Sequence, residues 1–370
     1  MGSDVKISAY QLMVLVSFFT LGTSTLATPA IIAEQAKQDA WIATLIGVGV
    51  GTVIILLYAN LAGRFPNKTF FQVLELVFGK WIGKALSLSL TLAALIFTST
   101  LLYYSGEFLN TEMLPNTPTL ALNLLMVSVI VMGAYLGLET VARSAEIFFM
   151  IFTVLFLLLF VFLLPEVKVE NLQPILDSPP MKIAAAAFSY IDVAILNAVF
   201  LLVIFPARVK GVQDGKKAFL TGSLIAGLAV LILTTMCILV LGQDYTAKQQ
   251  YPGYELVKKI SIGNFIQRVE SSAAMLWSLT LYFKATLYFL FAVLGIAHLL
   301  GRNNYTRFTY PFGAAALVLS LVLYPNIIDF KHWNATVGRG ISVYAGVAVP
   351  LLLAIVYAVR RKGLKKSGKI

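Results

Sequence analysis

Charged residues are scarce in this sequence. Asp, Glu, Lys and Arg together make up 12% of its 370 residues, about half of the ~25% that is usual in a soluble domain. So few charges cannot coat the surface of a globule of this size, and the apolar fraction of 59% points the same way. We therefore expect a surface that faces lipid, which excludes a soluble enzyme.

Cysteine and histidine are also nearly absent. The single cysteine, Cys237, excludes an internal disulfide bond, and His298 and His332 do not form a metal-ligand pattern with it. The sequence has no phosphate-binding loop, and the glycines of Gly47–Gly51 lack the strand–helix–strand context of a dinucleotide fingerprint. We accordingly expect no metal, no cofactor and no enzymatic activity.

Long apolar runs are abundant. Two of them contain one charge each, Ile183–Ala207 with Asp192 and Ser271–Gly301 with Lys284. Each run is close to the ~20 residues that a helix needs to cross the hydrocarbon core, whereas transmembrane strands would show ~10-residue alternating segments. The expected fold is an all-α membrane protein with about ten transmembrane helices in a single domain, 1–370. The eight runs without any charge are Ile7–Ala33, Ala40–Gly63, Ala85–Gly106, Met113–Leu138, Ile147–Pro165, Ala218–Gln243, Phe308–Ile328 and Gly340–Val359.

The basic residues are distributed unevenly between the connectors. If both termini lie in the cytoplasm, 18 Lys and Arg residues fall on the inner side and nine, Arg339 among them, on the outer side. This excess fits the positive-inside rule and accounts for the net charge of +11 without a nucleic-acid partner. The basic cytoplasmic tail, residues 360–370, is expected to lie against anionic membrane lipid.

Two connectors are expected to carry short helices. Residues 69–78 are amphipathic and are followed by Gly79, a pattern typical of a helix that lies on the membrane surface. The connector 244–265 contains Tyr254 to Ile260, for which we expect a second short helix at the interface.

The first apolar run is interrupted near its middle. Residues 20–29 contain Gly22, a series of hydroxyl residues and Pro29. Glycine allows the chain to leave helical geometry, and proline removes a backbone donor. An unwound point exposes backbone groups, which a membrane tolerates only where protein or ligand satisfies them. The alternative is a kinked packing helix whose Ser and Thr side chains bond back to the preceding turn.

The sixth apolar run carries an acid. An acidic residue near mid-membrane usually faces a cavity or a partner, and a break between Asp192 and Asn197 would turn both side chains inward. The alternative is that Asp192 lies near an interface and is hydrated.

The eighth apolar run carries Lys284 near the middle of the helix expected over 269–300. Trp277, Thr280, Lys284 and Tyr288 share one helical stripe. Snorkelling to either interface is hard from mid-membrane, so we expect carbonyls or a carboxylate around the ammonium. A snorkelling lysine on a tilted helix is the alternative.

The two interrupted runs, the first and the sixth, are five helices apart. This pattern indicates a transporter fold built from two inverted repeats, here about 8–165 and about 182–361. A small ligand would then lie at mid-membrane between the two breaks. Free N–H groups at the start of a half-helix favour a carboxylate, so an α-amino acid fits, with its amino group near free carbonyls or Asp192.

Several short motifs make the chain resemble a known family. They are Arg64–Thr69, Gly79–Lys84, Gln267–Glu270, Trp277 and Phe283–Lys284. Over nearly its whole length the chain resembles the spore germination permeases, the B subunits of bacterial nutrient germinant receptors, within the amino acid–polyamine–organocation superfamily. The family often has Glu-Arg where this chain has Gln267–Arg268. The resemblance implies a LeuT-like 5+5 inverted-repeat fold with broken helices 1 and 6.

The resemblance also implies a function in sporulating bacteria. The chain would be the ligand-sensing subunit of a receptor in the spore inner membrane, with both termini on the spore core side. It would act with an A subunit and a lipoprotein C subunit on a small nutrient, often an L-amino acid. The pocket would lie between helices 1, 3, 6 and 8, and its implied residues are Gly22, Thr23, Ser24, Thr25, Thr98, Tyr190, Asp192, Ala194 and Trp277.

Lys284 takes a separate place in this implied site. In cation-coupled relatives of the superfamily a sodium ion lies between helices 1 and 8, so the ammonium of Lys284 would replace that ion or titrate with proton movement. Lining by Leu26, Leu101 and Val193 would favour a ligand with a small or apolar side chain.

Two other functions stay open from the residues alone. One is a proton- or cation-coupled amino acid transporter, and the other is a structural scaffold for partner subunits. Two aligned helix breaks argue against the scaffold, because a scaffold does not need them. Receptor and transporter need the same pocket, so the sequence does not separate them.

Overall fold

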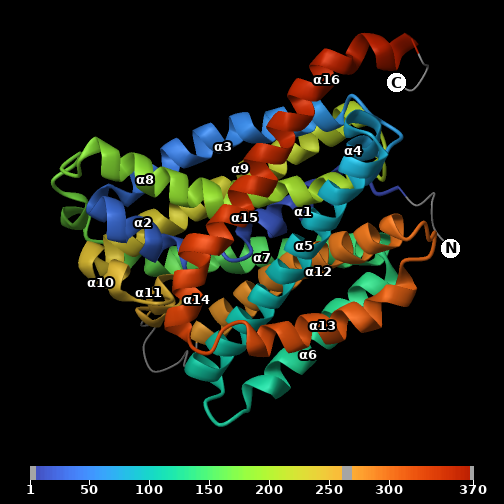
Figure 1. Cartoon of the computed structure of the whole chain (residues 1–370). Coiled ribbons are helices and arrows are strands. Elements are labelled where there is room, and N and C mark those ends of the chain that lie inside the picture. Colours follow the sequence, from blue (N-terminus) through green and yellow to red (C-terminus); the bar gives the residue numbers. More distant parts are fainter. Residues whose placement is uncertain (1–5, 261–268, 367–370) are drawn as a thin grey trace.

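The computed structural model describes residues 6–260 and 269–366, and that part of the chain is almost entirely helical (Figure 1). The motif residues Gln267 and Arg268 lie outside the described residues. The long helices are α3 (Ala40–Ala62), α5 (Lys80–Phe108), α6 (Thr119–Leu136), α7 (Leu138–Leu163), α9 (Val212–Leu241), α12 (Val269–Leu299) and α16 (Val349–Lys366). The shorter helices are α1 (Ala9–Leu21), α2 (Thr28–Ala36), α4 (Phe70–Phe78), α8 (Pro180–Tyr190), α10 (Gln243–Lys248), α11 (Pro252–Lys258), α13 (Thr309–Val322), α14 (Ile327–Trp333) and α15 (Arg339–Val343).

The number of membrane spans agrees with the expectation from the sequence. Eight helical stretches of the described chain are long and apolar enough to cross a membrane. Two shorter apolar helices, α1 and the stretch that contains α13, correspond to the first and ninth runs. The first of the eight stretches, Thr28–Ala62, contains both α2 and α3. The first apolar run, 7–33, covers α1 and most of α2, and we therefore assign α1 and α2 to helix 1. The all-α fold with about ten transmembrane helices is confirmed.

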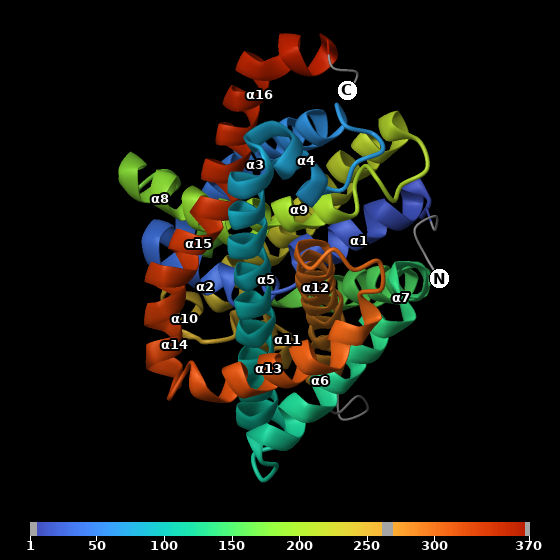
Figure 2. The same ribbon diagram turned by 45° about the vertical axis from the view of Figure 1, so that its right-hand side comes forward.

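The helices differ greatly in how much of their surface faces protein. In α12, 83% of the apolar window is buried inside the protein, against 17% in α7. A helix that is apolar all round and buried belongs to the core, whereas the same composition with an exposed surface suits lipid contact. Figure 2 shows α12 beside α5 at the centre of the bundle and α14, α15 and α16 following one another along its side.

Two short helices form where the sequence predicts them, and both bury their apolar side chains in the protein. Thr69 begins α4 with a reciprocal cap, because its hydroxyl accepts from the amide of Gln72 while the Gln72 side chain accepts from the amide of Thr69. Gly79 ends α4 at φ +89°, a conformation that favours glycine. The second helix, α11, covers Pro252–Lys258 and so begins two residues before the expected Tyr254.

Helices 1 and 6 are interrupted in different ways. The chain leaves helical geometry after α1 and resumes it at α2, with Gly22 to Ala27 between them. Helix 6 stays wound, but it changes from α8 to a π turn, η5 (Ile191–Ile195), and then to a tighter 3₁₀ segment, η6 (Leu196–Val203). The expected interruption between Asp192 and Asn197 is therefore a change of winding. A π turn of this kind is frequent at functional sites.

Helix 10 is longer than the uncharged run 340–359 from which it was predicted. Its true length changes the assignment of Arg339. The helix begins at Ile327 in α14 and continues through α15 to the end of α16, with π turns at Asn334–Gly338 and Tyr344–Ala348. Arg339, which we placed in an outer connector, therefore lies inside helix 10. The error arose because a run defined by the absence of charge must end at the first charged residue.

Candidate functional site

The ammonium of Lys284 joins the two interrupted helices. Its Nζ atom donates to Oγ1 of Thr23 at 3.1 Å and to the carbonyl of Val193 at 3.3 Å. The side chain is buried, and Nζ lies 5.5 Å from the centroid of the Phe19 ring, within reach of a cation–π interaction. A carbonyl in the π turn of helix 6 thus accepts from a side-chain donor. The ammonium of Lys284 thus faces one hydroxyl of helix 1 and one carbonyl of helix 6.

The close approach of α12 to the interruption depends on Gly22. A Cβ atom on Gly22 would overlap the side-chain carbons of Lys284. The carbonyl of Gly22 accepts a hydrogen bond from Oγ1 of Thr280, one turn before Lys284, at 3.3 Å. Thr280 and Lys284 therefore hold the interrupted part of helix 1 against α12 at two points.

A tyrosine of α3 satisfies carbonyls of two irregular helices. The hydroxyl of Tyr58, which is buried, donates to the carbonyl of Leu196 at 3.3 Å and also contacts the carbonyl of Gly346. Leu196 begins the 3₁₀ segment of helix 6, and Gly346 lies in the second π turn of helix 10. A side chain at Gly346 would press on the backbone of Leu196, so the two helices touch there.

Asp192 is paired with Arg339, a partner that the sequence analysis missed. Oδ2 of Asp192 accepts from Nε of Arg339 at 3.3 Å, while Oδ1 is buried and has no hydrogen-bond partner among the described residues. Asn197 donates to the carbonyl of Asp192 at 3.2 Å, and Ser342 donates to the side-chain oxygen of Asn197 at 3.3 Å. Helix 10 is thereby connected to the site.

A sequence signal for Arg339 does exist. The side chain of Asn326 accepts from the amides of Ile328 and Asp329, which is the capping pattern that begins a helix. Reading Asn326 as a cap would have started helix 10 upstream of Arg339 and placed the guanidinium within the membrane.

Thr23, Asp192, Lys284 and Arg339 line a cavity of about 540 Å³. It lies between helices 1, 3, 6, 8 and 10, and α10 contributes Ala247 and Lys248 to its mouth. Its size falls within the ~300–1,000 Å³ of ligand pockets. Within residues 6–260 and 269–366, no three His, Cys, Asp or Glu side chains gather into a cluster that could hold a metal. The charged and hydroxyl groups on the wall include Thr23, Glu34, Asp192, Lys248, Lys284, Lys331 and Arg339.

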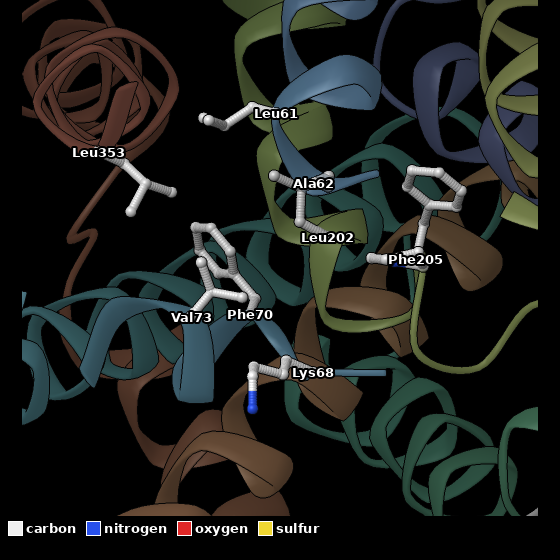
Figure 3. Close-up of a pocket in the computed structure, with 9 residues that line it drawn as sticks. Leu61, Ala62, Lys68, Phe70, Val73, Leu202, Phe205 and Leu353 are labelled. Atoms are coloured by element: carbon white, nitrogen blue, oxygen red, sulfur yellow. The ribbon is translucent and has the colours of Figure 1, made fainter. Parts of the chain in front are cut away.

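The other end of helix 6 is closed by apolar packing, shown in Figure 3. Leu202 and Phe205 lie around a space of about 10 Å³ together with Phe70 of α4 and Leu353 of α16. This space has room for about one water molecule. The nitrogen of Lys68 points away from the apolar side chains in this view. The large cavity therefore opens on the face that carries α10 and α14, and the face with α4 is packed.

The first half of helix 1 is also fixed on the α4 face. The amide of Ile7 donates to the carbonyl of Arg208 at 2.9 Å, and the amide of Lys210 donates to the carbonyl of Ile7 at 3.0 Å. The side chain of Gln11 donates to Glu146 of α7 at 3.2 Å. These contacts hold the start of helix 1 against helix 5 and against the connector that follows helix 6.

Three of the expected site residues line the cavity: Thr23, Asp192 and Lys284. Leu101 and Val193, expected to shape the ligand's side-chain pocket, line it as well. Gly22 does not line the cavity and instead makes room for Lys284.

Helix 1 places its other two expected site residues behind the wall. The hydroxyl of Ser24 donates to the carbonyl of Thr20 at 2.9 Å. Thr25 lies under α11, where its carbonyl faces Gly253 so closely that a Cβ atom on that glycine would overlap it. Leu26, which was expected near the ligand's side chain, is buried outside the cavity wall.

The remaining expected site residues also belong to the packing around the cavity. Thr98 donates to its own helix at the carbonyl of Ala94. Tyr190 packs where Gly47 of α3 makes room for its ring, and Ala194 is fully buried. Trp277 stacks edge-on against Phe108 with centroids 4.5 Å apart. Four residues that the resemblance implied for the pocket therefore do not line the cavity: Thr98, Tyr190, Ala194 and Trp277.

Comparison with known sequences finds related proteins that align with almost the whole chain. The family model described as "Spore germination protein" matches residues 6–328. Spore germination protein KB of Bacillus subtilis (strain 168) is 27% identical over 98% of this chain and 97% of its own length. Spore germination protein YndE of the same strain is 24% identical over 97% of this chain and 98% of its own length.

Comparison with solved structures identifies transporters of the same fold. The nucleobase–cation symport transporter MHP1, in a closed conformation with bromovinylhydantoin bound, superimposes with a TM-score of 0.71 at 10% identity, covering 97% of this chain and 80% of its own. MhsT in complex with L-phenylalanine gives a TM-score of 0.69 at 15% identity, covering 97% and 90%. At such low identity the likeness shows the fold alone, and it agrees with the expected LeuT-like 5+5 architecture with interrupted helices 1 and 6.

Proposed function

This chain belongs to the spore germination protein family, and from that membership we propose that it is the ligand-sensing membrane subunit of a spore nutrient germinant receptor. One observation carries the proposal: a cavity open on one face reaches the interruptions of helices 1 and 6, where Asp192, Lys284 and Arg339 present charge. Charged groups inside a membrane are expensive and mark functional sites. A purely structural scaffold would have no use for such a cavity.

The ligand that we propose is a small nutrient, an L-amino acid in the first instance. The cavity offers two acids, Glu34 and Asp192, and several cations, which suits a zwitterion better than a hydrocarbon. Leu101 and Val193 add apolar wall for a side chain. A transporter of the same fold, MhsT, was solved in complex with L-phenylalanine, which supports an amino acid as the ligand.

Within the site we propose two roles for residues at the interruptions. Thr23 and Asp192 face the ligand directly, and Lys284 occupies the place that a bound cation has in cation-coupled relatives. The double contact of Lys284 with Thr23 and Val193 supports that role. Gly22, Ser24, Thr25, Thr98, Tyr190, Ala194 and Trp277 would act by shaping the surroundings.

The proposed setting is the inner membrane of the spore, with both termini on the core side and the cavity mouth facing outward. The A and C subunits of the receptor are the proposed partners. Arg361 and Lys362, exposed at the end of α16, would lie against anionic lipid on the core side.

The second candidate function is a proton- or cation-coupled amino acid transporter, favoured by the transporter fold itself. Binding and uptake, measured in parallel, separate the two. Purified protein would be tested against the twenty L-amino acids by thermal shift, and in proteoliposomes for uptake of each labelled binder. Binding without uptake supports the receptor, uptake supports the transporter, and the absence of binding contradicts both.

A further inference from the structure

The ion pair between Asp192 and Arg339 leaves binding capacity on both side chains. Oδ1 of Asp192 is buried without a hydrogen-bond partner among the described residues, and leaving a buried oxygen unpaired is unfavourable. Arg339 is 38% exposed, and its hydrogen bond to Asp192 uses only Nε. Both side chains line the cavity. Two side chains of opposite charge therefore lie next to each other on its wall, with Oδ1 of Asp192 itself covered.

We propose that Asp192 and Arg339 together bind the charged ends of the ligand, the ammonium beside the carboxylate of Asp192 and the carboxylate on the terminal nitrogens of Arg339. This makes Arg339 a ligand-binding residue on helix 10, and it rests on the proposed function of the chain. The planar guanidinium fork is suited to a carboxylate. The carboxylate of Asp192 in turn offers the opposite charge to the ammonium.

The contact between the two side chains sets the spacing of the ligand's charges. Oδ2 of Asp192 and Nε of Arg339 are 3.3 Å apart, so their remaining binding atoms are neighbours. In an α-amino acid the nitrogen and the carboxyl carbon are about 2.5 Å apart, two bonds from one another. Each methylene inserted between them moves one charge away from its partner. The pair therefore selects α-amino acids over β- and γ-amino acids.

Other cations of the site are less suited to the carboxylate. Lys284 already donates to Thr23 and to Val193. Lys248 and Lys331 are exposed at the mouth, where water weakens their attraction. The backbone amides at the start of α2 are the alternative binding site for the carboxylate.

The test measures how strongly each protein prefers a carboxylate. Wild-type, Arg339→Gln and Arg339→Lys proteins, full-length in detergent, would be titrated calorimetrically with the twenty L-amino acids. For each binder, the corresponding α-amino amide and, where one exists, the β-amino acid would follow. Lys182→Gln, an exposed lysine outside the cavity, is the matched control. Thermal unfolding of each protein confirms that it is folded.

We expect the wild type to bind the acid about 10- to 100-fold more tightly than the amide, and the β-amino acid more weakly as well. Arg339→Gln should lose most of that acid preference, Arg339→Lys should lose part of it, and Lys182→Gln should keep it. A full acid preference in Arg339→Gln overturns the proposal and favours the start of α2. If Arg339→Gln does not fold, a full preference in Arg339→Lys has the same force. Absence of binding to wild type overturns the proposed function and this inference with it.

Discussion

Nζ of Lys284 and Oγ1 of Thr23 lie 3.1 Å apart, joining the eighth helix to the point where the first is unwound. The same ammonium reaches the carbonyl of Val193 in helix 6. One buried charge thus holds the two interruptions in a fixed relation. We therefore expect a ligand that displaces one of the two helices to displace the other as well.

Replacing Lys284 with Met tests that role. Met is apolar and close in size but has no donor, so Thr23 and Val193 lose a charged hydrogen-bond partner. We expect binding of the amino acid to weaken by about tenfold or more, measured by thermal shift. Lys217→Met, an exposed lysine on α9, should bind like the wild type. A folded Lys284→Met protein with unchanged affinity would rule the role out.

Gly22 and Gly49 make a matched pair of glycine substitutions. A Cβ atom at position 22 would overlap the Lys284 side chain, whereas one at Gly49 meets nothing within 4 Å. We expect Gly22→Ala to lower the free energy of unfolding by about 1–3 kcal/mol and to weaken binding. Gly49→Ala, inside α3, should be neutral or stabilising by up to about 1 kcal/mol. Equal unfolding transitions for the two variants would show that the close approach at Gly22 is unimportant.

Tyr58→Phe tests the link between helices 6 and 10. The change removes only the hydroxyl and leaves the carbonyls of Leu196 and Gly346 without their donor. We expect a loss of about 1–3 kcal/mol in the free energy of unfolding, measured by denaturation in detergent. Tyr10→Phe, at a tyrosine that is 53% exposed, is the control and should be neutral. A Tyr58→Phe protein as stable as the control would contradict the assignment.

The ion pairs that attach α11 to the rest of the protein should weaken at alkaline pH. Lys258 forms ion pairs with Glu255 at 2.6 Å and with Glu112 at 3.0 Å. Burial lowers the pKa of Lys258, but its hydrogen bonds to Glu255 and Glu112 outweigh burial and hold the pKa above its ordinary value. A raised pKa means that the stabilisation is complete below the ordinary lysine pKa and is lost as pH rises through the folded value.

Lys258→Gln should accordingly unfold at a slightly lower temperature than the wild type at neutral pH. The two transition temperatures should converge as the pH is raised past the pKa of the lysine. Lys259→Gln, the neighbouring lysine, serves as the control. A Lys258→Gln difference that stays constant up to strongly alkaline pH would contradict an electrostatic origin.

The sequence predicts the fold of this chain well and its site in part. Apolar runs identify the spans because a membrane imposes one length and one composition on every helix. Gly22, Asp192 and Lys284 could be picked out because each violates that composition. Arg339 does not stand out in this way, because it lies at the edge of an apolar run, where charges are ordinary, and only the cap at Asn326 indicates that helix 10 begins before it.

The direction in which each side chain leaves its helix explains most of the other differences between the expected and the observed cavity residues. Trp277 and Lys284 share a stripe of α12, yet Lys284 faces the interruption while Trp277 packs on Phe108. A stripe is wide enough to face two neighbouring helices. Tyr190, two residues before Asp192, faces Gly47 rather than the cavity. The π turn that follows Tyr190 changes the direction of the side chains, and composition gives no sign of it.

The most direct test of the account is protection of the cavity wall by ligand. Ala27 lines the cavity, and Tyr245 lies on α10 outside it. The native Cys237 is buried and therefore inert toward a polar thiol reagent. The rate of labelling of Ala27→Cys would be measured with and without an L-amino acid that binds, with Tyr245→Cys as the control. The account predicts about tenfold slower labelling of Ala27→Cys at about ten times Kd and no change at Tyr245→Cys. Equal labelling of Ala27→Cys with and without the bound amino acid would contradict it.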